Sequence, residues 1–313
     1  MIQYTIRRIF FIIPTLWAVV TVVFFLIRIV PGGPALAALG AYASEEQIRA
    51  LEHQMGLDRP LMVQYVTYLA DLCRGDLGKS LITQRPVIKE ITLALPYTLD
   101  LTIAGMVLGI LMGVPVGIFT ALKRNRLPDY LGRIFSLTGI SMPEFYLGIL
   151  LMYLFAVKLN LFPVIGGGDL NEWGSRIYHL VLPAFTLGII MTSFISRMTR
   201  SSMLNVIGED YVRTARAKGV NERMVVYKHA LRNALIPTTT VIGLYAGILM
   251  GGSVLTEIVY SRPGLGKMMV YAVKDRDYMT LQTVIVIFSA AVFLLNLLTD
   301  VLYSLIDPRI EYQ

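Results

Sequence analysis

Hydrophobic residues gather in six long runs along the chain. The runs cover residues 9–30, 97–122, 131–157, 179–196, 237–256 and 279–305. A helix needs about 20 apolar residues to cross the hydrocarbon core of a bilayer. An open strand in lipid would leave backbone groups unpaired. The pattern therefore predicts an all-α polytopic membrane protein with six transmembrane helices.

The first run could also belong to a secretory signal peptide, because Arg7 and Arg8 precede it and Ala35-Leu36-Ala37 has the form of a cleavage site. However, the stretch from Ile9 to Ile27 is longer than the roughly 7–15 apolar residues of a signal peptide. We therefore predict a retained first span. The chain then divides into a first helix at 1–30, an outer loop at 31–95 and a core of five helices at 96–309.

The outer loop contains two helical patterns. Ser44-Glu45-Glu46-Gln47 fits a capping box, and Gly56 is a suitable helix stop. Apolar residues recur at helical spacing at Ile48, Leu51 and Met55, and again at Leu61, Tyr65, Tyr68 and Leu72. We expect short amphipathic helices against the outer membrane face. They would either cap the spans or form part of a docking surface for an external partner, and the sequence favours neither.

Composition supports the membrane assignment and gives its direction. The chain is 55% hydrophobic and 16% charged, whereas soluble domains have about 25% charged residues. Its net charge of +7 fits cytoplasmic loop bias better than nucleic-acid binding. One face collects Arg7, Arg8, Lys123, Arg124, Arg126, Arg133, the basic residues from Arg197 to Arg232, and Arg309. Both termini and the loop at 205–236 are therefore predicted to be cytoplasmic.

Two spans carry glycines at intervals of four residues. They are Gly105, Gly109, Gly113 and Gly117 in the second span, and Gly243, Gly247 and Gly251 in the fifth. Such a ridge lets another helix approach closely, so these glycines are predicted to serve helix packing. The alternative is that smooth faces let helices slide during transport.

Ionisable residues in spans are functional candidates, because burying a charge in lipid is costly. Asp100 and Glu257 are expected near the outer interface and Asp300 near the inner one. Glu144, in SMPEF, is expected to lie deeper and is the candidate for a transport pathway.

The sequence predicts neither a catalytic residue nor a metal site. RPGLGKMM has Ser261 and Met268 where a Walker motif needs glycine and a hydroxyl residue. The three histidines are scattered, and Cys73 is the only cysteine. Energy for active transport would have to come from elsewhere.

The basic loop has the pattern of two helices around a corner. A helix is expected from about Asn205 to Lys218, with Gly219 as its left-handed stop. Asn221 can cap a second helix that runs toward Pro237. The simpler interpretation is a solvated basic loop with no binding function. The pattern fits better a short helix that inserts into the groove of a partner.

The stretch from Asp210 to Pro237 resembles the EAA loop of ABC importer permeases, in which Glu-Ala-Ala is followed by Gly and a distant Leu-Pro. Here Thr214 replaces the glutamate, as is usual in the peptide and nickel branch. The chain also resembles that branch in five further motifs: GLDRP at 56–60, GDLGKS at 75–80, RPGLGK at 262–267, RDY at 276–278 and DPRI at 307–310. A departure is Gly33 in PGGPA, where the family often has aspartate.

The resemblance implies the type I importer permease fold, in a bacterial inner membrane. It implies a second homologous permease, usually non-identical, and two cytoplasmic ATPases that bind ATP and Mg, whereas this chain binds no cofactor. It also implies an external solute-binding protein. The residues that would couple to the ATPase are Tyr211, Arg213, Thr214, Ala215, Arg216, Ala217, Lys218, Gly219, Val220 and Asn221.

Three functions remain open on the sequence. One is import of di- or oligopeptides, including glutathione-like ligands, and another is import of nickel or a metal chelate by the same machine. The third is a stand-alone channel or ion-driven carrier, in which a coupling loop would have no purpose. We favour peptide import, because that class is common.

Overall fold

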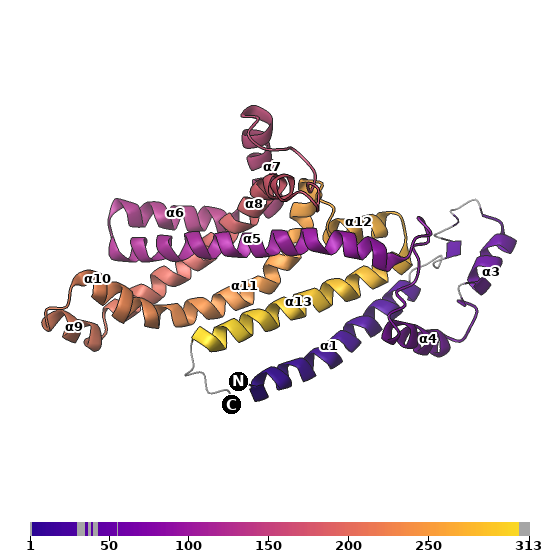
Figure 1. Cartoon of the computed structure of the whole chain (residues 1–313), viewed down its shortest axis with the longest axis horizontal. Coiled ribbons are helices and arrows are strands. Elements are labelled where there is room, and N and C mark those ends of the chain that lie inside the picture. Colours follow the sequence, from indigo (N-terminus) through magenta and orange to yellow (C-terminus); the bar gives the residue numbers. More distant parts are fainter. Residues whose placement is uncertain (1, 30–34, 37–38, 40–42, 55, 307–313) are drawn as a thin grey trace. The chain divides into compact units, whose positions relative to one another are not determined.

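The computed structural model describes residues 2–29, 35–36, 39, 43–54 and 56–306. The PGGPA residues before Ala35, Met55 and the DPRI motif with Arg309 lie outside them. The regular elements of the described chain are helices, which confirms the all-α class (Figure 1). They are α1 Ile2–Ile29, α3 Glu45–Gln54, α4 Leu61–Cys73, α5 Val87–Leu122, α6 Leu127–Ser141, α7 Glu144–Leu151, η1 Met152–Lys158, α8 Trp173–Ile207, α9 Asp210–Ala217, α10 Glu222–Met224, η2 Val225–Ala230, α11 Leu231–Val259, α12 Leu265–Lys274 and α13 Tyr278–Ile306.

Within the described residues, 5 helical segments are long and apolar enough to cross a bilayer. They are Phe10–Ile29, Val87–Leu122, Trp173–Ile207, Glu222–Val259 and Tyr278–Thr299. These match five of the predicted runs, but several helices extend beyond them. For example, α8 covers Trp173–Ile207, whereas the apolar run covers only 179–196. Hydropathy marks the part buried in lipid, while the backbone hydrogen bonds of a helix continue into more polar turns.

The third span differs from its prediction. An unbroken helix over 131–157 is wrong, because α6 and the α7–η1 segment meet at an angle of 109°. Pro143 explains the break, since a proline disfavours the helical conformation of the residue before it. Met142 is accordingly extended, with φ −84° and ψ 126°. The bent pair still satisfies the length and hydropathy of one span.

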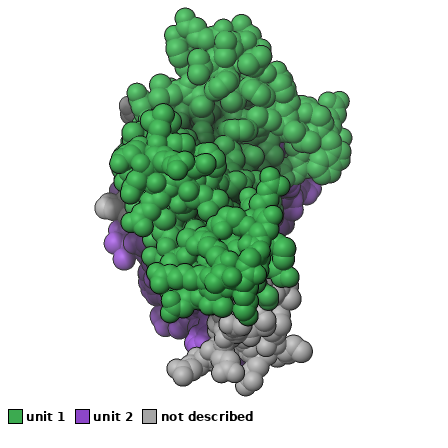
Figure 2. Space-filling view, turned by 90° about the vertical axis from the view of Figure 1, so that its left-hand side faces the viewer, with its two compact units in different colours: residues 1–5, 98–262, 294–313 green, residues 6–97, 263–293 purple. Residues whose placement is uncertain are grey.

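The chain forms two compact units, each built from separate stretches of sequence (Figure 2). Unit 1 comprises residues 1–5, 98–262 and 294–313, and unit 2 comprises residues 6–97 and 263–293. The segments predicted from the sequence, 1–30, 31–95 and 96–309, are instead each one continuous stretch of the chain.

Helix α8 is the central element of unit 1, and the glycine ridge of α5 lies against it. A Cβ atom placed on Gly105 would lie 2.8 Å from Cβ of Leu187, and one on Gly113 would lie 2.7 Å from Cβ of Ile195. Such approaches are too close for any side chain. Gly109 and Gly117 face Met191 and Thr199 of α8 in the same way. The contact between the two helices therefore repeats every four residues on both of them.

The glycines of α11 have different surroundings. Gly247 faces the amide of Asn296 on α13, and Gly243 lies near Thr299. Among the described residues, no atom beyond its own helix and chain neighbours lies within 4 Å of a Cβ placed on Gly251. The fifth-span glycines thus do not form one continuous packing ridge within this chain.

In unit 2 the outer helix α4 packs against the first span, and α3 begins with the predicted cap. The Ser44–Gln47 capping box is confirmed, because the backbone N–H of Gln47 donates to Ser44 Oγ and that of Ser44 donates to Gln47 Oε1. On α4, the Tyr65 hydroxyl lies 2.6 Å from Thr21 Oγ1 of α1. Arg28 of α1 donates to Gln64 Oε1 at 2.9 Å. These contacts support a packing role for α4.

One carboxylate joins two motifs that are far apart in the sequence. Asp277 of the RDY motif accepts hydrogen bonds from the Ser80 hydroxyl at 2.5 Å and from the Leu81 backbone N–H at 3.1 Å. It also accepts from the hydroxyl of Thr280 in the first turn of α13. GDLGKS and RDY therefore form one corner of unit 2.

The contact between α5 and α8 predicts that alanine affects stability differently at Gly109 and at Gly251. Gly109→Ala should destabilise the purified chain by about 1–3 kcal/mol, because the new methyl group would overlap Met191. Gly251→Ala, also inside a helix but facing open space, should be neutral or stabilising. Thermal unfolding midpoints in detergent compare the two variants, and equal midpoints would contradict the packing assignment.

Candidate functional site: the basic loop and the charged residues of the spans

The loop at 205–236 folds into a compact corner at one end of unit 1. Helix α8 ends at Ile207 and α9 begins at Asp210, after an extended Glu209. The expected continuous helix from Asn205 is thus wrong. Two polar residues, Glu209 and Asp210, interrupt the apolar pattern there, and the N–H of Glu209 instead bonds Val206 O.

The corner after α9 has the geometry that the sequence predicts. Gly219 has φ +76°, in the left-handed region that favours glycine. Its N–H donates to Arg216 O, and the N–H of Val220 donates to Ala215 O. Asn221 then caps the next helix, because its side-chain oxygen accepts from Arg223 N at 2.9 Å.

The second helix is longer than expected. Helices α10, η2 and α11 follow without a break from Glu222 to Val259, so Pro237 lies inside a helix rather than at its end. A proline in a helix interior costs about 3 kcal/mol. Packing offsets this cost here, since Ala234 and Thr238 on either side of Pro237 are fully buried.

Helix α9 is fixed to the rest of the loop by one apolar face. Val212 and Ala215 are buried against Val225 of η2. The Tyr211 hydroxyl accepts a hydrogen bond from Asn233 of α11 at 2.7 Å. The opposite face, which includes Arg213, Thr214 and Lys218, is exposed. Helix α9 thus presents a basic surface while its other face is anchored.

An ion pair braces the corner. Arg216 donates to both carboxylate oxygens of Glu222, at 3.1 and 2.8 Å. The hydrogen bonds to Glu222 hold the pKa of Arg216 above its ordinary value, so the guanidinium remains charged. Glu222 was not among the residues predicted from the sequence. The signal was present, since an Arg and a Glu flank the predicted glycine corner.

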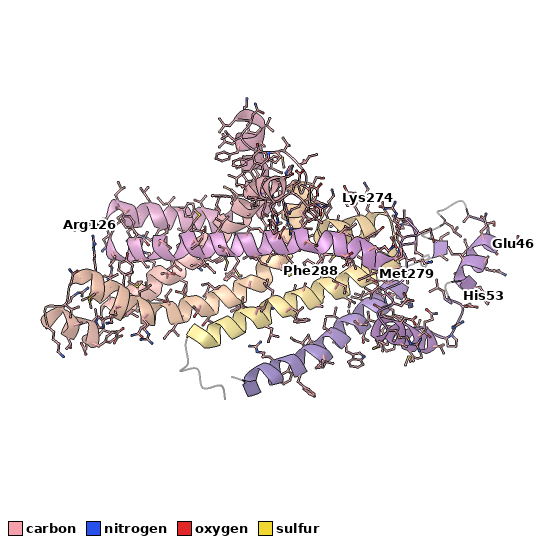
Figure 3. The ribbon with its side chains drawn as sticks, in the orientation of Figure 1. Glu46, His53, Arg126, Lys274, Met279 and Phe288 are labelled. Carbon is pink, nitrogen blue, oxygen red and sulfur yellow. The ribbon has the colours of Figure 1, made fainter. Side chains whose placement is uncertain are left out.

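The base of the loop is buried against two spans. Val226, Ala230 and Ala234 of the returning helix pack with Met203 of α8 and with Ile118 and Ala121 of α5. The basic turn between α5 and α6, which carries Arg126, lies at the same end of unit 1 as α9 and α10 (Figure 3). Basic residues from two loops therefore gather at one end.

Two acids in the spans are paired with arginines that the sequence analysis did not connect with them. Arg176 of α8 donates to Asp100 of α5 through Nε at 2.5 Å and Nη2 at 2.8 Å. Arg200 of α8 donates to Asp129 of α6 at 2.6 and 3.0 Å. These pairs lie far apart in sequence, so spacing along the chain gives no signal for them.

Two further acids bond to hydroxyl groups. Thr98 of α5 donates to the fully buried Glu257 of α11 at 2.6 Å. Thr256 of α11 donates to Glu144 of α7 at 2.5 Å. The side chain of Asp300 lies outside the described part of the structure. Within the described residues, no group of three or more His, Cys, Asp or Glu side chains could hold a metal ion.

Breaking the Asp129 pair tests the role of these charges. Asp129→Asn should lower the stability by about 2 kcal/mol, below the usual range for buried pairs, because Arg200 remains 21% exposed. Asp210→Asn, at a side chain that is 98% exposed, is the matched control and should have little effect. Equal unfolding midpoints for the two variants in detergent would show that the Asp129–Arg200 pair does not stabilise the chain.

Known proteins match this chain over its whole length. A family model described as the inner membrane component of binding-protein-dependent transport systems matches residues 113–312, and a model for the N-terminal part of such components matches residues 1–102. The glutathione transport system permease protein GsiC of Salmonella paratyphi A is 44% identical over 313 residues, covering all of both chains. The dipeptide transport system permease protein DppB of Alkalihalophilus pseudofirmus is 42% identical over 333 residues, again covering all of both.

Solved structures support the fold. The inward-facing MetNI methionine ABC transporter matches with a TM-score of 0.56 at 20% identity, over 71% of this chain and 98% of that chain. An amino acid ABC transporter matches with a TM-score of 0.50 at 16% identity, over 71% and 95%. At these identities the likeness concerns the fold alone.

Proposed function

The chain belongs to the family of binding-protein-dependent transport system inner membrane components, and on this premise we propose that it forms half of a translocation pathway for short peptides. The full-length identity to permeases named for glutathione and dipeptides carries the proposal. The chain is a multi-pass inner-membrane subunit of an ABC importer that works with ATPase and binding-protein partners. ATP hydrolysis belongs to the separate ATPase subunits, which would bind ATP and Mg.

The surface through which the ATPase would act is α9 with its corner, from Tyr211 to Asn221. Its exposed face carries Arg213, Thr214 and Lys218, which suits a groove lined by acidic and polar groups. Its buried face packs on Val225. A push on α9 would therefore reach η2 directly instead of being absorbed in a flexible loop.

From η2 the movement has two routes into the membrane. One route runs along the unbroken helix from Glu222 to Val259. The other passes through the buried contact of Val226 and Ala230 with Met203 of α8. Alternating access would follow if closure of the ATPases tilts these two helices together. The second permease is proposed to be a non-identical homologue that receives the second ATPase.

The proposed topology puts both termini and the basic loop in the cytoplasm. The turn with Arg126 lies at the α9 end of unit 1 (Figure 3), where Arg213 and Lys218 are also exposed, and this basic end supports the topology. The loop with α3 and α4 would then face the binding protein.

The corner glycine gives the decisive test of coupling. In proteoliposomes that hold both permeases, both ATPases and the binding protein, uptake of a dipeptide or glutathione should require ATP. Gly219→Val should abolish this uptake, because a β-branched residue is strained at φ +76°. A Cβ at position 219 meets no described atom within 4 Å, so the effect is conformational rather than a clash.

The control is made at the same position. Gly219→Asn should keep most of the activity, since asparagine tolerates the left-handed region. Both variants should be recovered in the membrane. If Gly219→Val retains ATPase binding and uptake, the corner has no coupling role. If the unaltered transporter takes up nickel but neither peptide, the substrate class is wrong.

The native cysteine tests the topology. Cys73, at the end of α4, is exposed and should react with a membrane-impermeant maleimide added to intact spheroplasts. In a Cys73→Ser background, Lys218→Cys should react only after the membrane is permeabilised. Labelling of position 218 from outside would reverse the proposed orientation.

A further inference from the structure

Glu144 places a carboxylate at the break in the third span. It is the first residue of α7, directly after Pro143, where α6 and α7 meet at 109°. Its side chain is only partly buried. A charge inside an apolar span is costly, and such groups nearly always face the bundle interior or a water-filled path. This position therefore needs an explanation beyond helix geometry.

Two residues of helix α11 contact this carboxylate. Thr256, itself buried, donates its hydroxyl to Oε1 of Glu144 at 2.5 Å. One turn earlier, Gly252 faces the same carboxylate so closely that a Cβ would collide with Oε2. Glycine and threonine on one helix thus form a niche in which the carboxylate sits, with Oε2 against bare backbone.

Glu144 differs in its partners from two other acids of unit 1, Asp100 and Asp129. Asp100 has Arg176 and Asp129 has Arg200 as partner. Within the described part of the chain, no Lys, Arg or His nitrogen lies within 4.0 Å of Glu144. A carboxylate in the first turn of a helix gains about 0.3–1 kcal/mol from the dipole. That gain does not explain why this one reaches across to α11.

The neighbouring surface would suit a small organic cation. Phe145 next to Glu144, and Ile248 and Leu255 on α11, are exposed apolar side chains. Gly251, one residue from Gly252, leaves further open space on α11. A ligand with one ammonium group and an apolar body could bond the carboxylate and lie on these side chains.

We propose that Glu144, held by Thr256 and Gly252, binds the free α-amino group of the peptide during its passage. This inference rests on the proposed function, because it assumes a peptide substrate. Glu144 then selects for substrates with a free ammonium group at a point inside the membrane. This selection is separate from that of the external binding protein.

The test removes the charge and keeps the hydrogen bond. Glu144→Gln still accepts from Thr256. Glu90→Gln is the matched control, since Glu90 also lies in the first turn of a helix and accepts a threonine hydroxyl, that of Thr83 at 2.8 Å. Both variants are assayed in the complete transporter, with a dipeptide and with its des-amino analogue, which lacks the ammonium group.

Glu144→Gln should lower the initial uptake of the dipeptide at least about tenfold, as expected for a lost charge-assisted bond. Uptake of the analogue, relative to the unaltered transporter, should not change, and Glu90→Gln should affect neither. Equal losses for both substrates would assign Glu144 a structural role. Unequal recovery of the two permeases on gel filtration would assign it to pairing with the partner permease, and either result overturns the proposal.

A second measurement needs no analogue. Glu144→Cys in a Cys73→Ser background should transport poorly. A thiosulfonate reagent that adds a sulfonate should restore uptake of the dipeptide, whereas one that adds an ammonium should not. A thiol that reacts with neither reagent, or equal uptake after both, would refute the proposal. If the unaltered transporter moves no peptide at all, the proposed function itself fails, which is a distinct result.

Discussion

The close approach of α5 and α8 is the constraint on which unit 1 depends. Lipid gives no hydrophobic drive for two apolar helices to associate, so their contact must come from dispersion and close packing. Gly105 and Gly113 let α8 approach until Leu187 and Ile195 lie against bare backbone. The repeat of four residues on both helices fixes their register. Ion pairs to Asp100 and Asp129 then fasten α8 to α5 and α6.

This fixed helix connects the membrane part to the basic loop. Helix α8 leads into α9, and α9 returns its apolar face to Val225 of η2. The loop is thus a folded extension of two spans. Under the proposed function this rigid connection would carry the coupling to the ATPase, because packed side chains and rigid helices can transmit a coupling free energy between sites. Glu144, at the bend of the third span, accepts a hydrogen bond from Thr256 of α11, the helix that continues from the loop.

The sequence predicted the spans and the local corners well, and it could not predict how they meet. The capping box at Ser44, the left-handed Gly219 and the cap at Asn221 are local, so a few adjacent residues determine them. The break at Pro143 was missed because hydropathy is insensitive to backbone breaks. The Arg200–Asp129 pair joins residues far apart in the chain, and only the packing of α6 on α8 brings them together.

The most direct test of coupling through α9 is site-specific cross-linking in inverted membrane vesicles. Thr214, on the exposed face of α9, is replaced by cysteine in a chain without Cys73 and carries a photoactivated cross-linker. Coupling through α9 predicts an adduct with the ATPase subunit, in a yield that differs between ATP and ADP. The same label at Asn125, in the α5–α6 turn, should give much less adduct. Equal adducts from both positions, or none from position 214, would contradict coupling through α9.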